Sequence, residues 1–349
     1  MITEPGAYNH PMVADDTCLL IEAVRRNCDV ADARHAREAT LCTYLLQMRE
    51  LHCWERNLPL TAQPPKEELA RWLTERESRW NRLEADGYET LPLGARRYDP
   101  FDAAGLNREL TGRGWVYGAG YGRFHRPHFF LATLERDFTR DGTRVLVAGA
   151  EHARDVATIP AALQGDTIYV RREALRRWLW EKVELWHARR NEGALARALE
   201  CWGVEAGEGP AFEHMVEAET ETLILHELGE ARAAAKLGTA WEDMLGALDD
   251  RRAELLARAV RDNLADCLTT LPVLLERDAR ASLHFWFAHL DGMRRELFPA
   301  LAAAYRDWRD SGSVSALEAA IGEGAGHWER VARMLLASGA RADSRAVAL

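Results

Sequence analysis

The sequence predicts a mainly α-helical protein of the α+β class, with a small antiparallel β-sheet in the middle of the chain. Before residue 90 and after residue 172, apolar residues recur at three- and four-residue spacing, which is typical of amphipathic helices. Between these stretches the composition shifts towards glycine, proline and aromatic residues. There the pair Asp141-Gly142 separates two strand-like segments, the pattern of a β-hairpin.

Composition and charge argue against several classes of protein. Of the 349 residues, 47% are apolar and 29% charged, which is ordinary for a globular chain of one large domain or two. The net charge of −10 argues against general binding to nucleic acid or anionic membranes. No segment approaches the roughly 18 apolar residues of a membrane span, and the N-terminus does not resemble a signal peptide. Six scattered cysteines without a CxxC pair predict a cytoplasmic protein.

We expect four consecutive regions. They are an N-terminal helical region (1–90), a region rich in glycine, proline and aromatic residues that holds the sheet (91–172), a C-terminal helical domain (173–337) and a mobile tail (338–349). Residues 1–15 are expected to form a loose arm.

The N-terminal region is expected to contain three helices. Cys18–Arg26 is a short amphipathic helix, a second helix starts at Asp29 or Asp32 and runs to about Trp54, and the third covers Lys66–Asp86.

The second of these helices carries a candidate polar site. Leu41, Leu45 and Met48 form its predicted buried stripe, and Glu38 extends that stripe by one turn. His35 lies three residues before Glu38, close to the same face. An inward-facing glutamate beside a histidine is a candidate metal-binding or acid–base pair, and an ion pair with a neighbouring arginine is the alternative.

The middle region is expected to hold the strands Phe129–Phe138, Thr143–Ala148 and Thr167–Val170. The glycine-rich segment Gly114–Phe130 reads as a loop or an irregular hairpin. Its basic side chains could bind an anion, with a plain surface loop as the alternative; they are Arg123, His125, Arg126 and His128.

The C-terminal domain is expected to be entirely helical. The predicted helices are Glu173–Asn191, Ala194–Trp202, a central helix from about Glu213 to Gly238, Trp241–Leu248, a helix from Asp249 or Asp250 to Pro272, Arg280–Ala304 with a kink at Pro299, and Leu317–Leu336.

The central helix, Leu223–Gly238, contains the most specific chemical pattern in the chain. His226 and Glu230 are four residues apart, so they project from the same side of the helix, one turn from each other. Two such ligands fix about half of a tetrahedral metal shell, and the adjacent Glu227 could take a proton from metal-bound water. The alternative is that these glutamates pair with arginines.

Two acids in the following helix are candidates for completing the site. Asp262 and Asp266 are four residues apart and flanked by apolar residues, and burying unpaired carboxylates is costly. They are predicted to supply the remaining metal ligand or to act as partners of the central histidine. Arg258 and Arg261 offer ion pairs as the alternative.

The segment HELGEA, His226 to Ala231, resembles the active helix of the zincin metallopeptidases, which reads HELGHA. The resemblance implies that His226 is a ligand and Glu227 the general base, and it places Glu230 at the second histidine ligand. It also implies a small antiparallel sheet before this helix. The carboxylate in place of a histidine makes bound water less acidic and widens the choice of metal from zinc towards manganese or iron.

A second metal arrangement is also open. Glu184 and His187 form an ExxH pair, whose spacing resembles one half of a carboxylate-bridged di-iron site, although the chain lacks a second ExxH. His35, Glu38, Glu184 and His187 would together make a possible second site.

Over about residues 28–275 the chain also resembles a family of bacterial hypothetical proteins without an assigned activity. The resemblance is carried by DVADARHA, TLCTYLLQMRE, RYDPFDA, YGRFHRPHFFL, LQGDTIYVRREALRRWLWEKVE, LILHELGE and ARAVRDNLADCLTTLP. It implies a bacterial cytoplasmic setting.

Three functions therefore follow as hypotheses. The first is a metal-dependent hydrolase acting on a small-molecule or peptide substrate, with zinc, iron or manganese bound by His226, Glu230 and Asp262 or Asp266. The second is a di-iron or di-manganese oxidoreductase, whose metal ligands would be His35, Glu38, Glu184, His187, His226 and Glu230. The third is a non-catalytic helical scaffold or binding protein with internal ion pairs. Homo-oligomerisation stays open.

Overall fold

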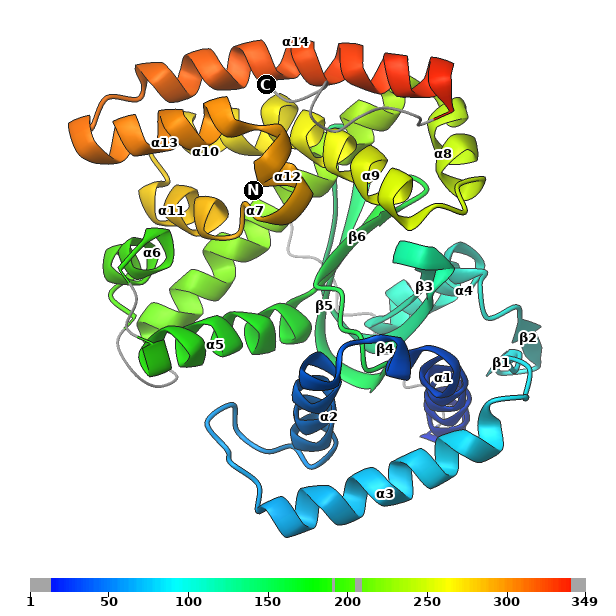
Figure 1. The fold of residues 1–349 in the computed structure, drawn as a ribbon. Coiled ribbons are helices and arrows are strands. Elements are labelled where there is room, and N and C mark those ends of the chain that lie inside the picture. The colour runs from blue at the N-terminus through cyan, green and yellow to red at the C-terminus, as the bar shows by residue number, and fades with distance from the viewer. Residues whose placement is uncertain (1–13, 190–191, 205–208, 340–349) are drawn as a thin grey trace, which may run out of the picture. The chain divides into compact units, whose positions relative to one another are not determined.

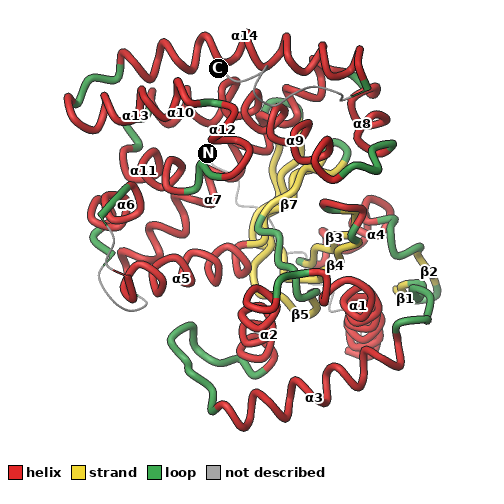
Figure 2. The backbone as a smooth tube through the Cα atoms, viewed as in Figure 1, coloured by secondary structure: helices red, strands yellow, loops and turns green. Residues whose placement is uncertain are grey.

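The computed structural model describes residues 14–189, 192–204 and 209–339. The predicted N-terminal arm (apart from residues 14 and 15) and almost all of the predicted C-terminal tail lie outside these residues. The described chain is mainly helical with two β-sheets, so the mixed α+β class is confirmed (Figures 1 and 2). It divides into two compact units. Unit 1 comprises residues 1–138, 145–160 and 169–177, and unit 2 comprises residues 139–144, 161–168 and 178–349.

Unit 1 begins with three α-helices, followed by short strands and a short helix. The elements are α1 (Ala14–His35), the 3-10 turn η1 (Ala36–Glu38), α2 (Leu41–Glu55), α3 (Lys66–Leu83), β1 (Leu91–Leu93), β2 (Arg96–Tyr98), α4 (Ala103–Leu110) and the 3-10 turn η2 (Thr111–Arg113). Strands β1 and β2 form a two-stranded antiparallel sheet.

The predicted start of the second helix is wrong. Helix α1 runs through Asp29 and Asp32, and the chain breaks only after His35. Both aspartates are buried rather than placed at a helix end: Asp29 accepts hydrogen bonds from Arg76 and Trp80, and Asp32 accepts one from the backbone N–H of Val156. An aspartate at a helix N-cap and an aspartate that pairs with a distant residue can have the same neighbours in sequence. The sequence alone therefore could not distinguish these two roles.

The predicted buried stripe of α2 is only partly correct. Met48 is 1% exposed, whereas Leu41 is 71% and Leu45 is 46% exposed. The helix instead turns Tyr44, Met48 and Leu51 towards a cluster that also contains Trp54, Trp72 and Trp80.

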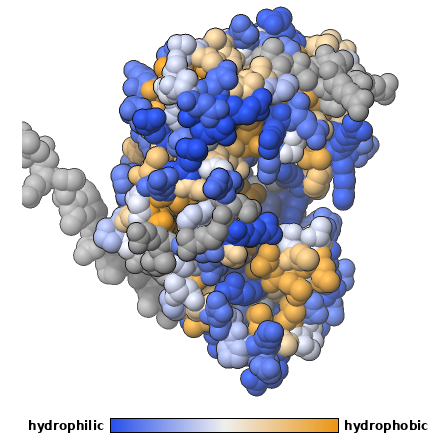
Figure 3. All heavy atoms as spheres, turned by 60° about the vertical axis from the view of Figure 1, so that its left-hand side comes forward, coloured by the Kyte–Doolittle hydropathy of each residue, from blue (hydrophilic) through white to orange (hydrophobic). Residues whose placement is uncertain are grey.

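The space-filling view shows polar residues over much of the drawn face, with hydrophobic residues visible in separate areas (Figure 3).

The second sheet has five strands in the order β3-β4-β5-β7-β6. The strands are β3 (Trp115–Tyr121), β4 (Pro127–Arg140), β5 (Thr143–Arg154), β6 (Ala161–Gln164) and β7 (Thr167–Arg171), and the 3-10 turn η3 (Arg123–His125) separates the first two. The predicted loop or irregular hairpin at Gly114–Phe130 is thus a hairpin, with Gly118 opposite Phe130. Asp141 and Gly142 both have positive φ, as the predicted hairpin turn between β4 and β5 requires.

One strand pair departs from the predicted antiparallel sheet. The backbone N–H of Arg144 donates to the carbonyl of Asp166, just before β7, at 3.1 Å. Further along β5, the backbone N–H of Glu151 donates to the side-chain Oε2 atom of Glu173, just after β7, at 2.7 Å. Because the contacts advance in the same direction along both strands, β5 and β7 are parallel.

Most of the described part of unit 2 is helical, and the unit also contains β6. Its helices are α5 (Arg172–Arg189, its first turns in unit 1), α6 (Ala194–Trp202), α7 (Pro210–Leu237), α8 (Thr239–Gly246), α9 (Arg251–Ala265), the π-helical turn η4 (Asp266–Thr270), α10 (Leu271–Glu276), α11 (Arg280–Ala288), α12 (Gly292–Leu297), α13 (Pro299–Ser311) and α14 (Ser315–Ser338). The single predicted helix Arg280–Ala304 is three helices, and Pro299 begins the last of them. None of the described helices combines the length and the apolar character needed to span a bilayer.

Helices α7 and α9 approach each other closely in the core of unit 2. A Cβ atom added at Gly229 on α7 would lie 2.3 Å from the carbonyl oxygen of Ala265 on α9. Glycine is therefore what lets the two backbones meet at this level. His226 and Glu230 lie on either side of Gly229 in sequence, and Asp266 follows Ala265, so this contact brings the candidate residues together.

Candidate metal centre

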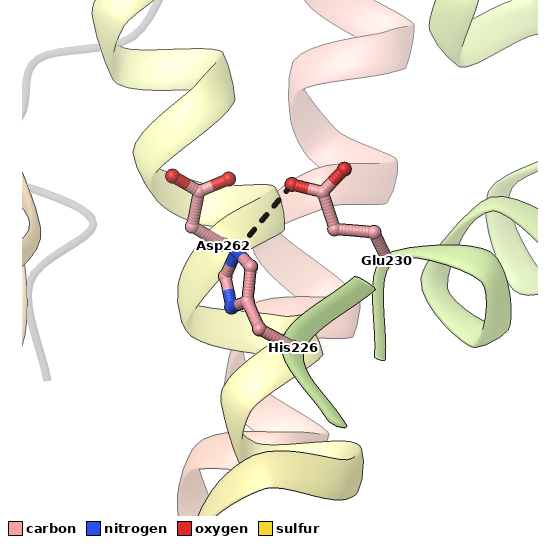
Figure 4. Close-up of side chains that lie close together, drawn as sticks. All are labelled: His226, Glu230 and Asp262. Carbon is pink, nitrogen blue, oxygen red and sulfur yellow. Dashed lines mark ion pairs between the residues drawn. The ribbon is translucent and has the colours of Figure 1, made fainter. Parts of the chain in front are cut away.

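The structure brings His226, Glu230 and Asp262 together in unit 2 (Figure 4). His226 and Glu230 project from α7 on consecutive turns, and Asp262 comes from α9. One ligand atom from each of the three residues lies within 4.8 Å of the other two, and His226 Nε2 is 3.6 Å from Glu230 Oε1. The helical spacing thus fixes two members of the cluster, and the packing of α9 on α7 adds the third.

Asp266 has a different role from Asp262. Its Oδ1 atom lies 2.8 Å from Nδ1 of His226, on the side of the ring opposite to the cluster, and its Oδ2 atom accepts a hydrogen bond from Arg294. A carboxylate on one ring nitrogen orients the imidazole and leaves the other nitrogen to face a ligand. Asp266 is 1% exposed and begins the π-helical turn, an irregularity frequent at functional sites.

Two arginines border the cluster. Arg261 Nη2 lies 2.6 Å from Glu230 Oε1 and 3.5 Å from Asp262 Oδ1. Arg294, on α12, pairs with Asp266 and stacks over the ring of Trp286. The sequence indicated Arg261 as an alternative ion-pair partner. It offered no sign of Arg294, which lies 28 residues beyond Asp266 and is brought there only by the fold.

Glu227, the predicted general base, is buried beside the cluster. Its Oε2 atom accepts a hydrogen bond of 2.6 Å from the backbone N–H of Leu163 on β6. Burial and the nearby Glu230 raise the pKa of Glu227 to about 8. A carboxyl group with such a pKa holds a proton at neutral pH in the metal-free state, and nearby positive charge would lower that pKa.

The other groups of the cluster have shifted pKa values as well. Burial opposes ionisation of Glu230, but Arg261 and His226 outweigh it and hold the pKa of Glu230 at about 2. Burial likewise disfavours the imidazolium form of His226, yet Asp266 and Glu230 raise the pKa of His226 well above its ordinary value. The metal-free cluster is therefore an ion-pair network with a charged His226.

The donor set and its spacing fit a divalent cation. One imidazole nitrogen and two carboxylate oxygens are ligands of zinc, manganese and iron. Two ligand atoms at about 2.1 Å from a tetrahedral ion are about 3.4 Å apart, and the observed separation of His226 Nε2 and Glu230 Oε1 is 3.6 Å. Within the described residues no other group of three histidine, cysteine or acidic side chains meets the same distance limit.

The residues predicted for a second metal site do not join such a group in the part of the chain that the structure describes. His35 and Glu38 form a pair of their own, with Nδ1 and Oε1 3.2 Å apart, and Glu38 lies on the 3-10 turn, 49% exposed, rather than on α2. Its predicted place on a buried stripe is therefore wrong. Glu184 and His187 lie on α5.

The predicted anion-binding residues fall into two sets. Arg126 pairs with Asp32 at 3.3 Å, and His128 Nδ1 lies 3.0 Å from Asp155 Oδ2, so both already face a carboxylate. Arg123 and His125 are exposed on the turn before β4. The arrangement favours the alternative of a surface turn, because two of the four basic groups have buried acidic partners.

The fold and the site together define an α+β protein whose helical unit carries a histidine–carboxylate cluster at a helix–helix contact. The N-terminal domain model of a family of unknown function (DUF6866) matches residues 19–171, and the C-terminal domain model of the same family matches residues 176–349. The two matches cover most of the chain, which therefore belongs to this family. No curated protein and no solved structure matches the chain.

Proposed function

We propose that this protein is a metal-dependent hydrolase whose divalent cation is held by His226, Glu230 and Asp262. The convergence of their three ligand atoms within 4.8 Å, from two packed helices, is the observation that carries the proposal. The orientation of His226 by Asp266 supports it, because metal-binding histidines usually have such a partner on the second ring nitrogen. Zinc is the first candidate, and the two carboxylates also suit manganese or iron.

Each residue then has a distinct task. Asp266 orients His226 so that the Nε2 atom of the imidazole faces the cluster. In the metal-free protein, Glu227 is protonated and lies beside the cluster. When bound, the cation would supply a water molecule of lowered pKa and polarise an ester or amide carbonyl. A bound cation would lower the pKa of Glu227 from its metal-free value of about 8, so that this carboxylate could take a proton from such a water. The substrate class is a small molecule or a peptide.

A helical binding protein with an internal ion-pair network is the second candidate. Its support is Arg261, which already neutralises Glu230, and Arg294, which neutralises Asp266. Three acids and three basic groups face one another when His226 is protonated, so the charges of the cluster balance without a cation.

Metal content separates the two candidates. Protein purified without chelator is expected to contain about one divalent ion per chain by elemental analysis, since one cluster among the described residues has the required ligands. Calorimetric titration of chelator-treated protein with Zn²⁺ and Mn²⁺ gives the affinity, and ester and peptide substrates then test hydrolysis with and without the ion. Absence of binding by both measurements would favour the ion-pair network.

Metal affinity is expected to increase with pH. The raised pKa of His226 means that Nε2 carries a proton below that pKa, and a cation can bind this nitrogen only after the proton leaves. The apparent affinity should therefore rise about tenfold per pH unit while one proton is displaced. Titrations between pH 5.5 and 8 in a buffer without metal affinity would measure it, and a pH-independent affinity would contradict binding through His226.

Replacement of Asp266 by asparagine is expected to weaken metal binding about 10- to 100-fold, the usual cost of altering the partner of a metal-bound histidine. The amide oxygen can still accept a hydrogen bond from Nδ1, but it lacks the charge that faces His226 and Arg294. Calorimetric titration measures the change. Asp310→Asn, at an exposed ion pair with Arg309, is the control that should leave the affinity unchanged.

A further inference from the structure

Arg261 and a bound cation would compete for the same oxygen atom. Glu230 Oε1, the atom nearest to His226 Nε2, is also the atom that contacts Arg261 Nη2 at 2.6 Å. The same nitrogen lies 3.5 Å from Asp262 Oδ1. One guanidinium nitrogen thus covers oxygens from both candidate carboxylate ligands. A cation can take up these oxygens fully only if that guanidinium moves.

A second acidic partner lies next to Arg261. The Nη1 atom of the guanidinium is 4.0 Å from Oε1 of Glu242, on α8, and the Glu242 side chain is 62% exposed. A carboxylate that remains hydrated can accept the guanidinium without a desolvation penalty of its own. Moreover, the buried Nε atom of Arg261 has no hydrogen-bond partner among the described residues, so its present position does not satisfy the whole group.

We infer that Arg261 gates the metal site: it covers Glu230 and Asp262 in the metal-free protein, and a divalent cation displaces its guanidinium towards Glu242. The inference rests on the proposed function. It assigns to Arg261 the control of metal affinity, because the free energy of breaking its contacts is subtracted from the binding free energy of the ion. Ions that bind carboxylates weakly are then excluded, while those with affinity for the imidazole as well can enter.

Two substitutions of opposite expected effect test the gate. Arg261→Gln removes the competing charge and should tighten Mn²⁺ and Zn²⁺ binding about tenfold or more, given the strength of a partly buried charge pair. Glu242→Gln removes the receiving carboxylate and should weaken binding of both ions about two- to fivefold, as expected for an exposed pair. Both are measured by calorimetric titration of the full chain. Arg258→Gln, on the same helix in a separate ion pair with Glu254, should leave the affinity unchanged.

The outcomes separate the gate from the metal site itself. If wild type binds either ion and Arg261→Gln binds no more tightly, the gate is overturned and the metal site stands. If only Arg261→Gln binds, both are supported. If neither protein binds, the proposed function fails and the gate with it. Should Arg261→Gln fold poorly because Glu230 loses its partner, the exposed Glu242→Gln still decides, since unchanged affinity in that variant contradicts the proposed movement.

Discussion

Replacement of His226 by alanine is expected to abolish metal binding and any hydrolytic activity that depends on it. His226 supplies the only nitrogen of the cluster, and without it two carboxylates remain that already face Arg261. The affinity should fall by more than about a hundredfold, because altering even the partner of a metal-bound histidine costs about 10- to 100-fold. Elemental analysis and calorimetric titration of wild type and variant provide the measurement.

His214→Ala is the matched control for this substitution. His214 lies on the same helix, α7, but its side chain is exposed. The control variant should keep the metal content and the affinity of the wild type. Equal metal content in His226→Ala and wild type would exclude this helix as the source of the ligands, and with it the proposed hydrolase site.

Replacement of Gly229 by alanine is expected to lower the free energy of unfolding. The added Cβ atom would lie 2.3 Å from the carbonyl oxygen and 2.8 Å from the carbonyl carbon of Ala265. Both are backbone atoms, so α7 and α9 would have to separate. Overpacking of this kind costs about 1–3 kcal/mol, and occasionally more. Because Glu230 and Asp266 adjoin this contact, metal affinity should fall together with the midpoint of thermal unfolding.

Gly322→Ala is the comparison variant, and we expect it to raise the free energy of unfolding. Gly322 lies on the exposed side of α14, and a Cβ atom there would have no neighbour within 4 Å. Removing the extra freedom of glycine from a helix interior should stabilise the protein by about 0.5–1 kcal/mol. Chemical or thermal unfolding of the two variants would measure both effects. A Gly229→Ala variant as stable as wild type would show that the helices can separate without cost.

Local patterns were enough to locate most of the secondary structure. Helix α6 has the predicted bounds, Ala194–Trp202, and the Asp141-Gly142 turn forms the predicted hairpin, since both follow from neighbouring residues. Local patterns gave wrong predictions where contacts with residues distant in sequence determine a helix boundary or the burial of a side chain. Asp29 lies inside α1 because Arg76 and Trp80 bind it there, and Leu41 is exposed because α2 packs through a different face.

The sequence by itself determined that His226 and Glu230 share one side of a helix, because the helical repeat fixes side-chain directions four residues apart. It also offered Asp262 and Asp266 without distinguishing their tasks. Only the tertiary structure decided that Asp262 joins the cluster, that Asp266 binds the far ring nitrogen, and that Arg261 covers the carboxylates. These roles depend on the close contact of α7 and α9 at Gly229, and helix packing at one backbone contact is not encoded in any local repeat.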